Sequence, residues 1–592
     1  MVEAAQQPKR RKRIAMVHPK FPPSFWSFGF IKEIGGFKTV MPPLGLATLA
    51  ALTPEEYDVV IVDENIEEID FEINADIIVL SSMAIQEERL FEVADEFRRR
   101  GYFVCMGGPI CNVLPGRCRP HCDVLFEGEG EYNWKIFLDE WEKGEHKDNY
   151  VQEEKVDLAD TPAPRVDLLK TNAYRVGCIQ TTRGCPFNCE FCDIIVTYGR
   201  KVRAKPIENV IKELQAWADA GVDFVTIADD NLVGDRIYAK KMLKAVGDWN
   251  RARKYPLSFY VEMSVDASRD VEFLELLRHA NVIETFLGIE SPKADQLKET
   301  KKFQNAATPL LDAIKIIQSY GVVIAAGMIV GFDNDDTSVF EDQYTFLQMA
   351  GIPVAMLGIL QAIPRTPLYE RIEKEGRLRS AAQGNNTLSV TNIEPKKMTY
   401  EELVTGYRDL FLRAYTWDAI GERWLNNVKQ WGPKRDTPPF PGKKEGERSP
   451  ADDPTRKWIQ KPLGRPRLHL LFATLLILKY YFAGGKEKRN FALKMMWNTL
   501  KLQPAAFMQT MNYLAYFIHL REYADKVVAR DVKFNYMFDE KNLNAKTLGE
   551  DGHINMVKKE KSKKTKINVH DAYDGAEVSA DVAADLETVS AK

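Results

Sequence analysis

The sequence predicts an α/β protein with three parts: a doubly wound, five-stranded parallel sheet, a partial barrel of six βα units and a helical C-terminal region. Three observations predict this class. Short apolar runs alternate with helical patterns from residue 14 to about 150, and again from about 176 to 390. Glycine or polar residues follow most of these runs, as at the carboxyl ends of parallel strands. From about residue 391 the pattern becomes helical and rich in aromatic side chains.

The first unit, residues 10–150, is a Rossmann-like domain. Its five strands are expected at residues 14–19, 59–64, 76–82, 102–109 and 123–131. Such near-continuous apolar strands indicate a parallel sheet covered on both faces. No G-x-G-x-x-G follows the first strand, which argues against NAD or FAD. Glycines at several strand ends, Gly107 and Gly108 among them, favour a different ligand beyond the carboxyl ends of the strands.

Residues 151–175 contain prolines and acidic residues without periodicity and are expected to form a linker. The second unit, residues 176–390, has six candidate strands. They are expected at residues 178–184, 224–231, 258–264, 283–291, 323–332 and 355–364. Six βα units with polar or glycine-rich strand ends predict a partial barrel, whose active site would lie at the carboxyl face of the strands.

The last part of the chain is expected to be a helical domain, residues 391–540, with a proline-rich extended loop at 433–466. The segment 467–525 is helical and carries aromatic side chains beside Lys and Arg, a combination that allows contact with a membrane surface. Residues 541–592 are polar, with separate basic and acidic stretches, and are predicted to be disordered.

Composition limits the class of protein. The 592 residues are 45% hydrophobic and 28% charged, with a formal net charge of −4, which argues against a basic nucleic-acid-binding protein. No stretch approaches the ~20 apolar residues of a membrane span, so we expect a cytoplasmic protein that can lie at the inner membrane surface. All eight cysteines lie at or before residue 192, which predicts a local metal or redox site rather than dispersed disulfides.

The most specific motif is R-G-C-P-F-N-C-E-F-C, which places Cys185, Cys189 and Cys192 directly after the first strand of the second unit. A structural zinc site needs four ligands, so a fourth ligand would be expected close to these cysteines in the sequence. A 4Fe–4S cluster held by three cysteines instead leaves one iron open. Cys178 lies seven residues earlier and is expected to be a buried small apolar residue. The C-R-P-H-C segment at 118–122 lacks two further nearby ligands and is expected to hold unpaired thiols.

The C-x3-C-x-aromatic-C motif after the first strand of a six-unit barrel resembles the radical S-adenosylmethionine superfamily. The resemblance implies that the open iron chelates S-adenosylmethionine and that an electron from the cluster cleaves it to a 5′-deoxyadenosyl radical. It assigns S-adenosylmethionine contacts to Phe191, Asp230, Glu262, Glu290 and Gly327. The GGE-type element of the superfamily is replaced here by residues 229–231, Asp-Asp-Asn, which puts the contact with the amino group in doubt.

The pairing of an N-terminal α/β unit with this barrel resembles the cobalamin-binding subclass, as do the segments 41–50 (MPPLGLATLA) and 126–131 (FEGEGE). The resemblance implies that the corrin faces strand-end loops with Ser81, Ser82, Gly107 and Gly108. The D-x-H-x-x-G element is absent, which implies that no protein histidine serves as the lower ligand of cobalt.

The segments 21–26 (FPPSFW), 62–67 (VDENIE) and 198–206 (YGRKVRAKP), with the C-terminal extension, resemble hopanoid C-2 methyltransferases. The resemblance spans about residues 14–530. It implies methyl transfer to an unactivated carbon of a hopanoid-like lipid, in which the 5′-deoxyadenosyl radical abstracts hydrogen and methylcobalamin supplies the methyl group. A second S-adenosylmethionine would remethylate cobalt, and a flavodoxin or ferredoxin would supply electrons. Nucleic acid is not an expected partner.

Two other hypotheses remain open at this point. One is a different cobalamin-dependent radical reaction, such as a cyclisation or ring rearrangement. Methylthiolation is disfavoured because a second cysteine cluster is missing: no cysteine follows residue 192. The other is a cobalamin- or redox-responsive regulator that keeps the same domains without turnover.

Overall fold

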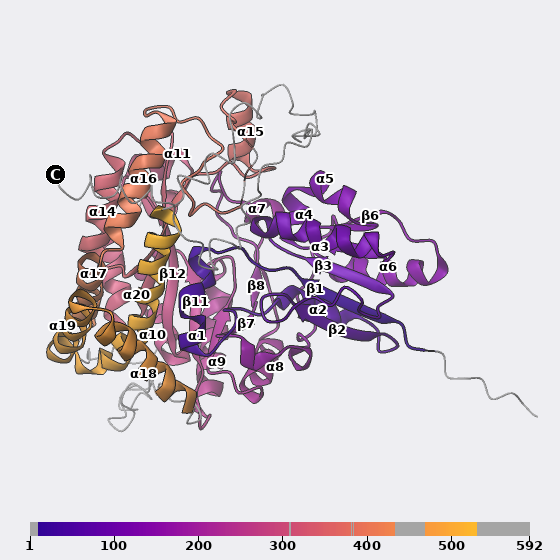
Figure 1. Ribbon diagram of the computed structural model, residues 1–592, viewed down its shortest axis with the longest axis horizontal. Helices are drawn as coiled ribbons and strands as arrows, with labels where there is room; N and C mark the ends of the chain where they lie inside the picture. The colour runs from indigo at the N-terminus through magenta and orange to yellow at the C-terminus, as the bar shows by residue number, and fades with distance from the viewer. Residues whose placement is uncertain (1–9, 307–308, 381, 383, 432–467, 530–592) are drawn as a thin grey trace, which may run out of the picture.

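The structure is a computed structural model that describes residues 10–306, 309–380, 382, 384–431 and 468–529. It contains two six-stranded parallel sheets, which confirms the predicted α/β class with parallel sheets. Figure 1 shows the first sheet towards one end of the molecule and the helices α18–α20 at the other. The expected proline-rich loop at 433–466 and the charged tail at 541–592 lie outside the described residues.

The first sheet has six strands, not the predicted five, in the order β2-β1-β3-β4-β5-β6. The strands are β1 (Arg13–His18), β2 (Asp58–Asp63), β3 (Ile77–Ser81), β4 (Val104–Gly107), β5 (Val124–Glu127) and β6 (Asn149–Val151). Strand β6 was missed because it is a three-residue edge strand whose only buried residue is Tyr150, so it leaves no apolar run. It ends at the first residue of the expected linker.

Both faces of the first sheet are covered. Ala15 and Val17 of β1 belong to one buried core, whereas their neighbours Ile14 and Met16 belong to another. This alternation follows from the pleat of a strand, which sends successive side chains to opposite faces. The helices of this part of the chain are α1 (Lys32–Gly35), α2 (Leu44–Leu52), α3 (Glu87–Arg99), α4 (Pro109–Val113), α5 (Pro115–Cys118) and α6 (Glu131–Lys143).

The second sheet has six parallel strands in chain order, β7 and β14 being its two edges. The strands are β7 (Gly177–Ile179), β10 (Phe224–Ile227), β11 (Ser258–Met263), β12 (Val282–Glu290), β13 (Val323–Val330) and β14 (Val354–Ile359). The helices are α7 (Ile194–Thr197), α8 (Ile207–Asp219), α9 (Arg236–Arg251), α10 (Val271–Ala280), α11 (Ala294–Glu299), α12 (Phe303–Ala306), α13 (Leu310–Ser319), α14 (Val339–Ala350) and α15 (Pro367–Lys374). A short antiparallel pair, β8 (Thr182–Arg183) and β9 (Arg203–Ala204), flanks the cysteine motif.

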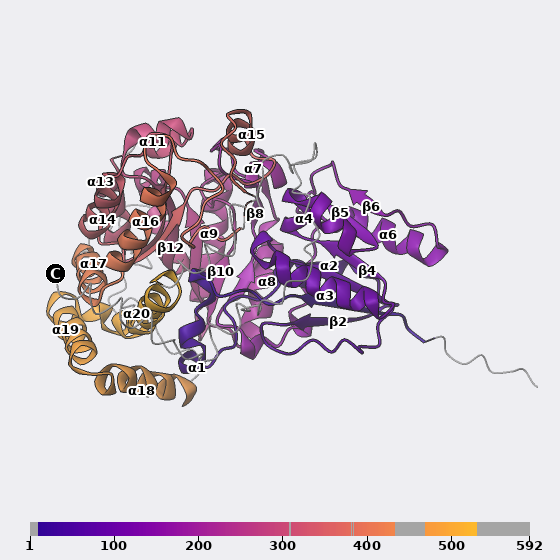
Figure 2. The ribbon, with the colours of Figure 1, turned by 45° about the horizontal axis from the view of Figure 1, so that its top comes forward.

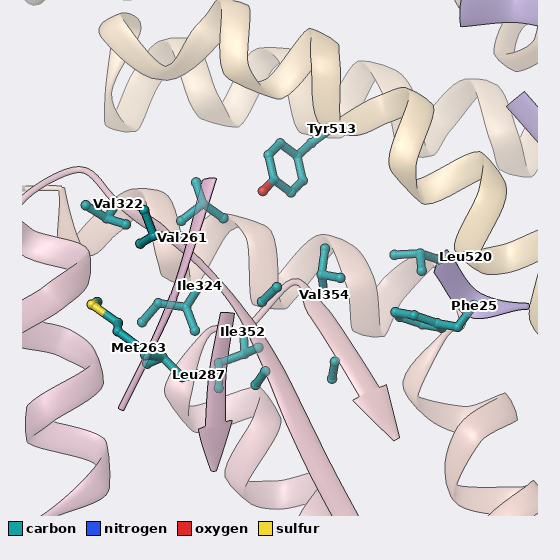
Figure 3. Packing of buried hydrophobic residues seen from close by; sticks show 14 of the residues in the cluster. Phe25, Val261, Met263, Leu287, Val322, Ile324, Ile352, Val354, Tyr513 and Leu520 are labelled. Atoms are coloured by element: carbon teal, nitrogen blue, oxygen red, sulfur yellow. The ribbon is translucent and has the colours of Figure 1, made fainter. Parts of the chain in front are cut away.

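The C-terminal helices pack on the second sheet and share its core. They are α16 (Tyr400–Ala414), α17 (Trp417–Gln430), α18 (Leu468–Ala483), α19 (Lys486–Leu502) and α20 (Phe507–Lys526). One buried cluster joins Val261 of β11 to Trp424 of α17 and Leu520 of α20. Figure 3 shows Tyr513 and Leu520 on the helix that lies over this part of the sheet. Among the described residues, no helix has the length and hydropathy needed to cross a membrane.

The connection between β1 and α2 leaves the first sheet and packs against the second. The Phe25 ring lies 6.4 Å from Phe411 and 6.1 Å from Tyr523, between centroids. The Trp26 indole contacts the Met356 sulfur of β14, 3.0 Å from Nε1, and meets the Phe286 ring of β12 edge-on. Residues 19–43 therefore tie the first sheet to the second sheet and to the C-terminal helices.

Glu284 lies in this shared core and makes the stability of the protein pH-dependent. Burial raises its pKa to about 7, against the lowering effect of a hydrogen bond from the Tyr513 hydroxyl. In the unfolded chain a Glu titrates near ~4.3. Between pH ~4.3 and pH ~7, Glu284 is therefore protonated in the folded protein but ionised in the unfolded chain. The stability that this proton contributes is fully present at low pH and is lost as the pH rises to about 7.

We therefore expect the stability of Glu284→Gln, relative to the wild type, to increase by up to ~3 kcal/mol from pH 4.5 to pH 8. Urea unfolding of both proteins at the two pH values measures this difference, and effects of other titrating groups cancel in the comparison. A difference that is the same at both pH values would contradict the prediction.

Candidate functional site

The three cysteines of the motif lie on one loop between β8 and β9, beyond the carboxyl end of β7. Gly184, just before Cys185, has φ +96°, and a Cβ there would lie 2.6 Å from the Lys201 carbonyl oxygen, so only glycine fits. Glu190, between the second and third cysteines, is buried, and its carboxylate forms an ion pair with the Arg371 guanidinium of α15 at 2.7 Å. The loop is thus fixed at its start, by Gly184, and again between the second and third cysteines, by Glu190.

The thiols are close enough to influence one another. Burial is the main cause that raises the pKa of Cys185 and of Cys189, and it raises the pKa of Cys192 to about 12 with the nearby Asp193. Within the described part of the chain, no three His, Cys, Asp or Glu side chains converge as a single metal ion would require. A four-iron cluster binds each thiolate through a different iron, and three thiols on one loop fit such a cluster.

The Asp229–Asn231 segment supports the cysteine loop from the end of β10. Asp229 is buried and accepts hydrogen bonds from the backbone N–H and hydroxyl groups of Thr181 and Thr182. Asp230 accepts one from the Gly184 N–H at 2.7 Å, and the Asn231 Nδ2 lies 3.9 Å from the Cys185 sulfur. Asp230 was predicted to contact the cofactor, and the structure shows that it also holds the cysteine loop through the Gly184 N–H.

Two of the predicted S-adenosylmethionine residues, Asp230 and Glu262, are carboxyls with a raised pKa. Burial raises the pKa of Asp230 to about 7, and the adjacent Asp229 adds to the effect. The pKa of Glu262 is raised to about 7 by burial, then by Asp230 and Asp229. The Glu262 carboxyl accepts no hydrogen bond from another described residue, so its oxygens are available for a ligand.

The other predicted contacts, Phe191, Glu290 and Gly327, lie around one ion pair. Glu290, in a left-handed conformation with φ +66°, forms a buried 2.5 Å ion pair with Lys302. Gly288 and Gly327 lie beside this pair: a Cβ on Gly288 would be 2.6 Å from Glu290 Oε1, and one on Gly327 would be 3.7 Å from Oε2. The Lys302 ammonium also lies 5.9 Å from the Phe191 ring centroid.

The four residues predicted to face a corrin come together at the ends of β3 and β4. Gly107 pairs with Ser81 in the sheet. Gly108 has φ +92°, and a Cβ there would lie 2.5 Å from the Ser81 hydroxyl and 3.1 Å from the Ser82 backbone. The buried Ser82 hydroxyl has no hydrogen-bond partner among the described residues. A glycine backbone packed closely on Ser81, next to the unpaired Ser82 hydroxyl, fits a strand-end ligand site.

The carboxyl ends of the two sheets are joined by buried ion pairs. Glu129, after β5, accepts hydrogen bonds from Arg183 at 2.8 Å and from Arg203 at 2.9 Å, and Arg183 also pairs with Glu131. Burial opposes the charge of Glu129, but the two arginines hold its pKa below the ordinary value. The strand-end loops of the first sheet therefore face the cysteine loop of the second.

A second contact between these ends comes from Arg365, after β14. Its guanidinium donates to the Asn112 carbonyl at 2.8 Å and pairs with Glu127 at the end of β5. The site is thus built from the segments that follow β4, β5, β7 and β14. In such sheets the ends of the strands are where ligands bind.

Several residues of this site were not anticipated from the sequence. Lys302 belongs to no recognisable sequence motif. The one feature of the sequence that links it to the site is its position twelve residues after Glu290. The Glu129–Arg183 pair joins residues 54 positions apart, and Trp26 meets Met356 across 330 positions. Separations of this size leave no periodic pattern in the sequence.

The remaining cysteines lie apart from the motif. Cys178 is buried in β7, as expected, and burial raises its pKa to about 12. Cys118 and Cys122 are buried as free thiols, whereas His121 pairs with Asp95 and stacks on Phe91. No metal-binding group involving these residues occurs among those the structure describes.

Two families match parts of the chain. Residues 179–346 match the radical SAM superfamily, and residues 366–532 match a family described as a domain of unknown function (DUF4070). An uncharacterized methyltransferase of Synechocystis sp. is 36% identical over 68% of this chain and 76% of its own length. The hopanoid C-2 methylase of Rhodopseudomonas palustris is 31% identical over 71% of this chain and 80% of its own length.

Solved structures share the fold at low identity. The cobalamin-dependent S-adenosylmethionine radical enzyme OxsB, with aqua-cobalamin and S-adenosylmethionine bound, matches with a TM-score of 0.53 at 15% identity, over 89% of this chain and 81% of its own. The radical S-adenosylmethionine methyltransferase TsrM from Kitasatospora setae, with cobalamin and a [4Fe-4S] cluster bound, matches with a TM-score of 0.52 at 15% identity, over 83% and 100%.

Proposed function

The chain belongs to the radical S-adenosylmethionine superfamily and, within it, to the methyltransferases that include hopanoid C-2 methylase, and from this premise we propose that it methylates an unactivated carbon of an apolar, hopanoid-like lipid. The observation that carries the proposal is that buried ion pairs join the segment after β5 of the first sheet, Glu129 and Glu131, to Arg183 and Arg203, which flank the cysteine loop of the second sheet. Two cofactors can therefore meet over one substrate.

The cofactors of this function are a 4Fe–4S cluster, S-adenosylmethionine and cobalamin. When bound, the cluster supplies the electron that cleaves S-adenosylmethionine to a carbon radical, and cobalamin supplies the methyl group. Cys185, Cys189 and Cys192 would hold the cluster within residues 176–390. Cobalamin would lie on residues 10–150, at the strand ends with Ser81, Ser82, Gly107 and Gly108.

The protein's own groups orient and insulate these cofactors. The Lys302 ammonium places a positive charge beside the Cys189 and Cys192 thiols. The pKa of Glu262 is about 7, so its carboxyl is partly protonated at neutral pH. It can therefore donate a hydrogen bond to S-adenosylmethionine or accept one from it. The buried Glu129–Arg183 contact keeps the two sheet ends together, which helps to exclude water from the space between them.

The lipid substrate is supported by the hopanoid C-2 methylase relative and by the side chains of the second sheet. Phe286 and Met356 point to the same face of that sheet, and Trp26 packs on both. All three are only partly buried although they lie against the core. An apolar wall of this kind can bind a ring hydrocarbon by burial, at about 25 cal/mol per Å² of apolar area.

The proposal is tested by anaerobic turnover with a reductant, hydroxocobalamin, S-adenosylmethionine carrying a deuterated methyl group, and a hopanoid or a total lipid extract. We expect a lipid that carries the deuterated methyl, together with 5′-deoxyadenosine. A flavodoxin or ferredoxin should replace the chemical reductant. Cleavage without methylated product would favour a cyclisation or ring rearrangement, and a bound cluster without any cleavage would favour a regulator.

A further inference from the structure

The helices α18 and α19 expose a set of large apolar side chains at the end of the molecule away from the first sheet (Figures 1 and 2). We call this set the apolar band. Its members are Phe472, Leu475, Phe482, Leu493, Trp497 and Leu500. Phe472 and Leu475 are each 63% exposed and Trp497 is 61% exposed. Several such side chains on two adjacent helices, rather than single ones, are typical of an interaction surface.

The band follows from the helical spacing of residues. In α18, Ala473, Ile477 and Tyr481 recur every four residues and are buried against the protein. Phe472, Leu475 and Phe482 lie on the outer side, at spacings of three and seven, with the exposed Lys479 between the last two.

In α19, Phe491, Met495 and Thr499 are buried in the same way, and Leu493 and Trp497 face outward. Each helix therefore has one apolar side for the core of the protein and a second apolar side that no described residue covers.

Basic residues surround the band. Residues 468–502 contain one acidic residue, Glu487, and six basic ones, which are Lys479, Lys486, Lys488, Arg489, Lys494 and Lys501. Lys488 and Lys494 have carboxylates within 3.6 Å, on Glu522 and Asp418 respectively. Lys479, Lys486 and Arg489 form no ion pair with any other residue that the structure describes. Their positive charge is therefore not neutralised within the described protein.

We propose that α18 and α19 form a docking face for the surface of an anionic lipid bilayer. Apolar side chains flanked by unpaired Lys and Arg match the boundary between acyl chains and anionic headgroups. A second copy of the same face is a poorer partner, because a symmetric contact would bring the basic residues of both copies together. Docking of this kind is peripheral and reversible, and it weakens with salt.

The test measures cosedimentation of the purified holoenzyme with vesicles of phosphatidylglycerol and phosphatidylcholine, and with vesicles of phosphatidylcholine alone. Changing Leu475→Asp and Trp497→Asp together should lower the partition coefficient at least about tenfold on the anionic vesicles. A matched control changes Ile237→Asp and Met349→Asp, which are 71% and 59% exposed on α9 and α14. The control should sediment like the wild type.

A second variant separates charge from apolar contact. Changing Lys479, Lys486 and Arg489 to Gln should weaken binding to anionic vesicles on the order of a hundredfold, at roughly fivefold per residue, and leave binding to neutral vesicles unchanged. This variant also keeps the proposal testable if the aspartate variant misfolds, which circular dichroism and cluster absorbance would reveal.

Three results would overturn the proposal. They are a wild-type protein that does not sediment with anionic vesicles, equal sedimentation of the wild type and both variants, and a concentration-dependent dimer that Leu475→Asp and Trp497→Asp abolish while vesicle binding is unaffected. The last result would assign the apolar band to a contact between two copies of the chain.

Discussion

Replacing Cys189 by Ala is expected to remove the iron–sulfur cluster and to reduce 5′-deoxyadenosine formation by at least about a thousandfold, because the cluster supplies the electron that cleaves S-adenosylmethionine. Cys189 lies in the loop that Gly184 and Glu190 hold in place, so the loop itself should keep its shape. The variant should lose the visible absorbance and the iron content of the reconstituted protein, and Cys185→Ala and Cys192→Ala should behave alike.

Two controls isolate the motif from the other thiols. Cys178→Ala and Cys122→Ala remove buried cysteines outside the loop and should retain the cluster. Full iron content and turnover in Cys189→Ala would refute the assignment. Loss of the cluster in Cys178→Ala, with the fold intact, would show that this residue is a fourth ligand.

Replacing Glu129 by Ala is expected to lower the free energy of unfolding by ~3–5 kcal/mol, because it leaves the buried Arg203 without a carboxylate partner, while Arg183 keeps only Glu131. The Glu129 side chain is 2% exposed, and Arg183 and Arg203 are each 12% exposed. Because Arg183 lies two residues before Cys185, cluster occupancy should fall as well. Urea unfolding and iron analysis measure the two effects.

The matched control is an exposed ion pair. Arg165 and Asp167 are 45% and 62% exposed, so Arg165→Ala should change the stability by less than ~1 kcal/mol. Glu129→Gln keeps the shape of the side chain without its charge and should fall between the wild type and Glu129→Ala. A Glu129→Ala protein as stable as Arg165→Ala would show that the two sheet ends are not joined through this carboxylate.

The parts of the fold that sequence analysis predicted are those with a strong local signal. Continuous apolar runs such as residues 323–330 predict strands because a parallel sheet buries both faces of a strand. The cysteine loop was predicted because the spacing of three thiols is itself the signal. Strand β6 was missed because only Tyr150 is buried in it, and one residue makes no pattern.

The rest of the site depends on long-range contacts. The sequence suggests Asp230 as a cofactor contact, but only the structure shows that its carboxylate also binds the Gly184 N–H. Lys302 becomes significant once the chain places it beside Glu290 and the thiols. Trp26 lies within the sequence of the first unit, but its side chain packs on the core of the second sheet. No change in amino-acid composition near residue 26 indicates this.

The position of Phe25 has a consequence for synthesis on the ribosome. Its carbonyl accepts a hydrogen bond from His519, 494 residues later in the chain, and its ring packs on Tyr523. At roughly 5–20 residues per second, α20 emerges about 25 to 100 s after Phe25. For most of that time the segment 19–43 has no completed partner surface, although the first sheet has all its strands once residue 151 has emerged. The nascent chain therefore carries the aromatic residues of this segment without their partners, and a chaperone that binds such residues can act on the segment during this interval.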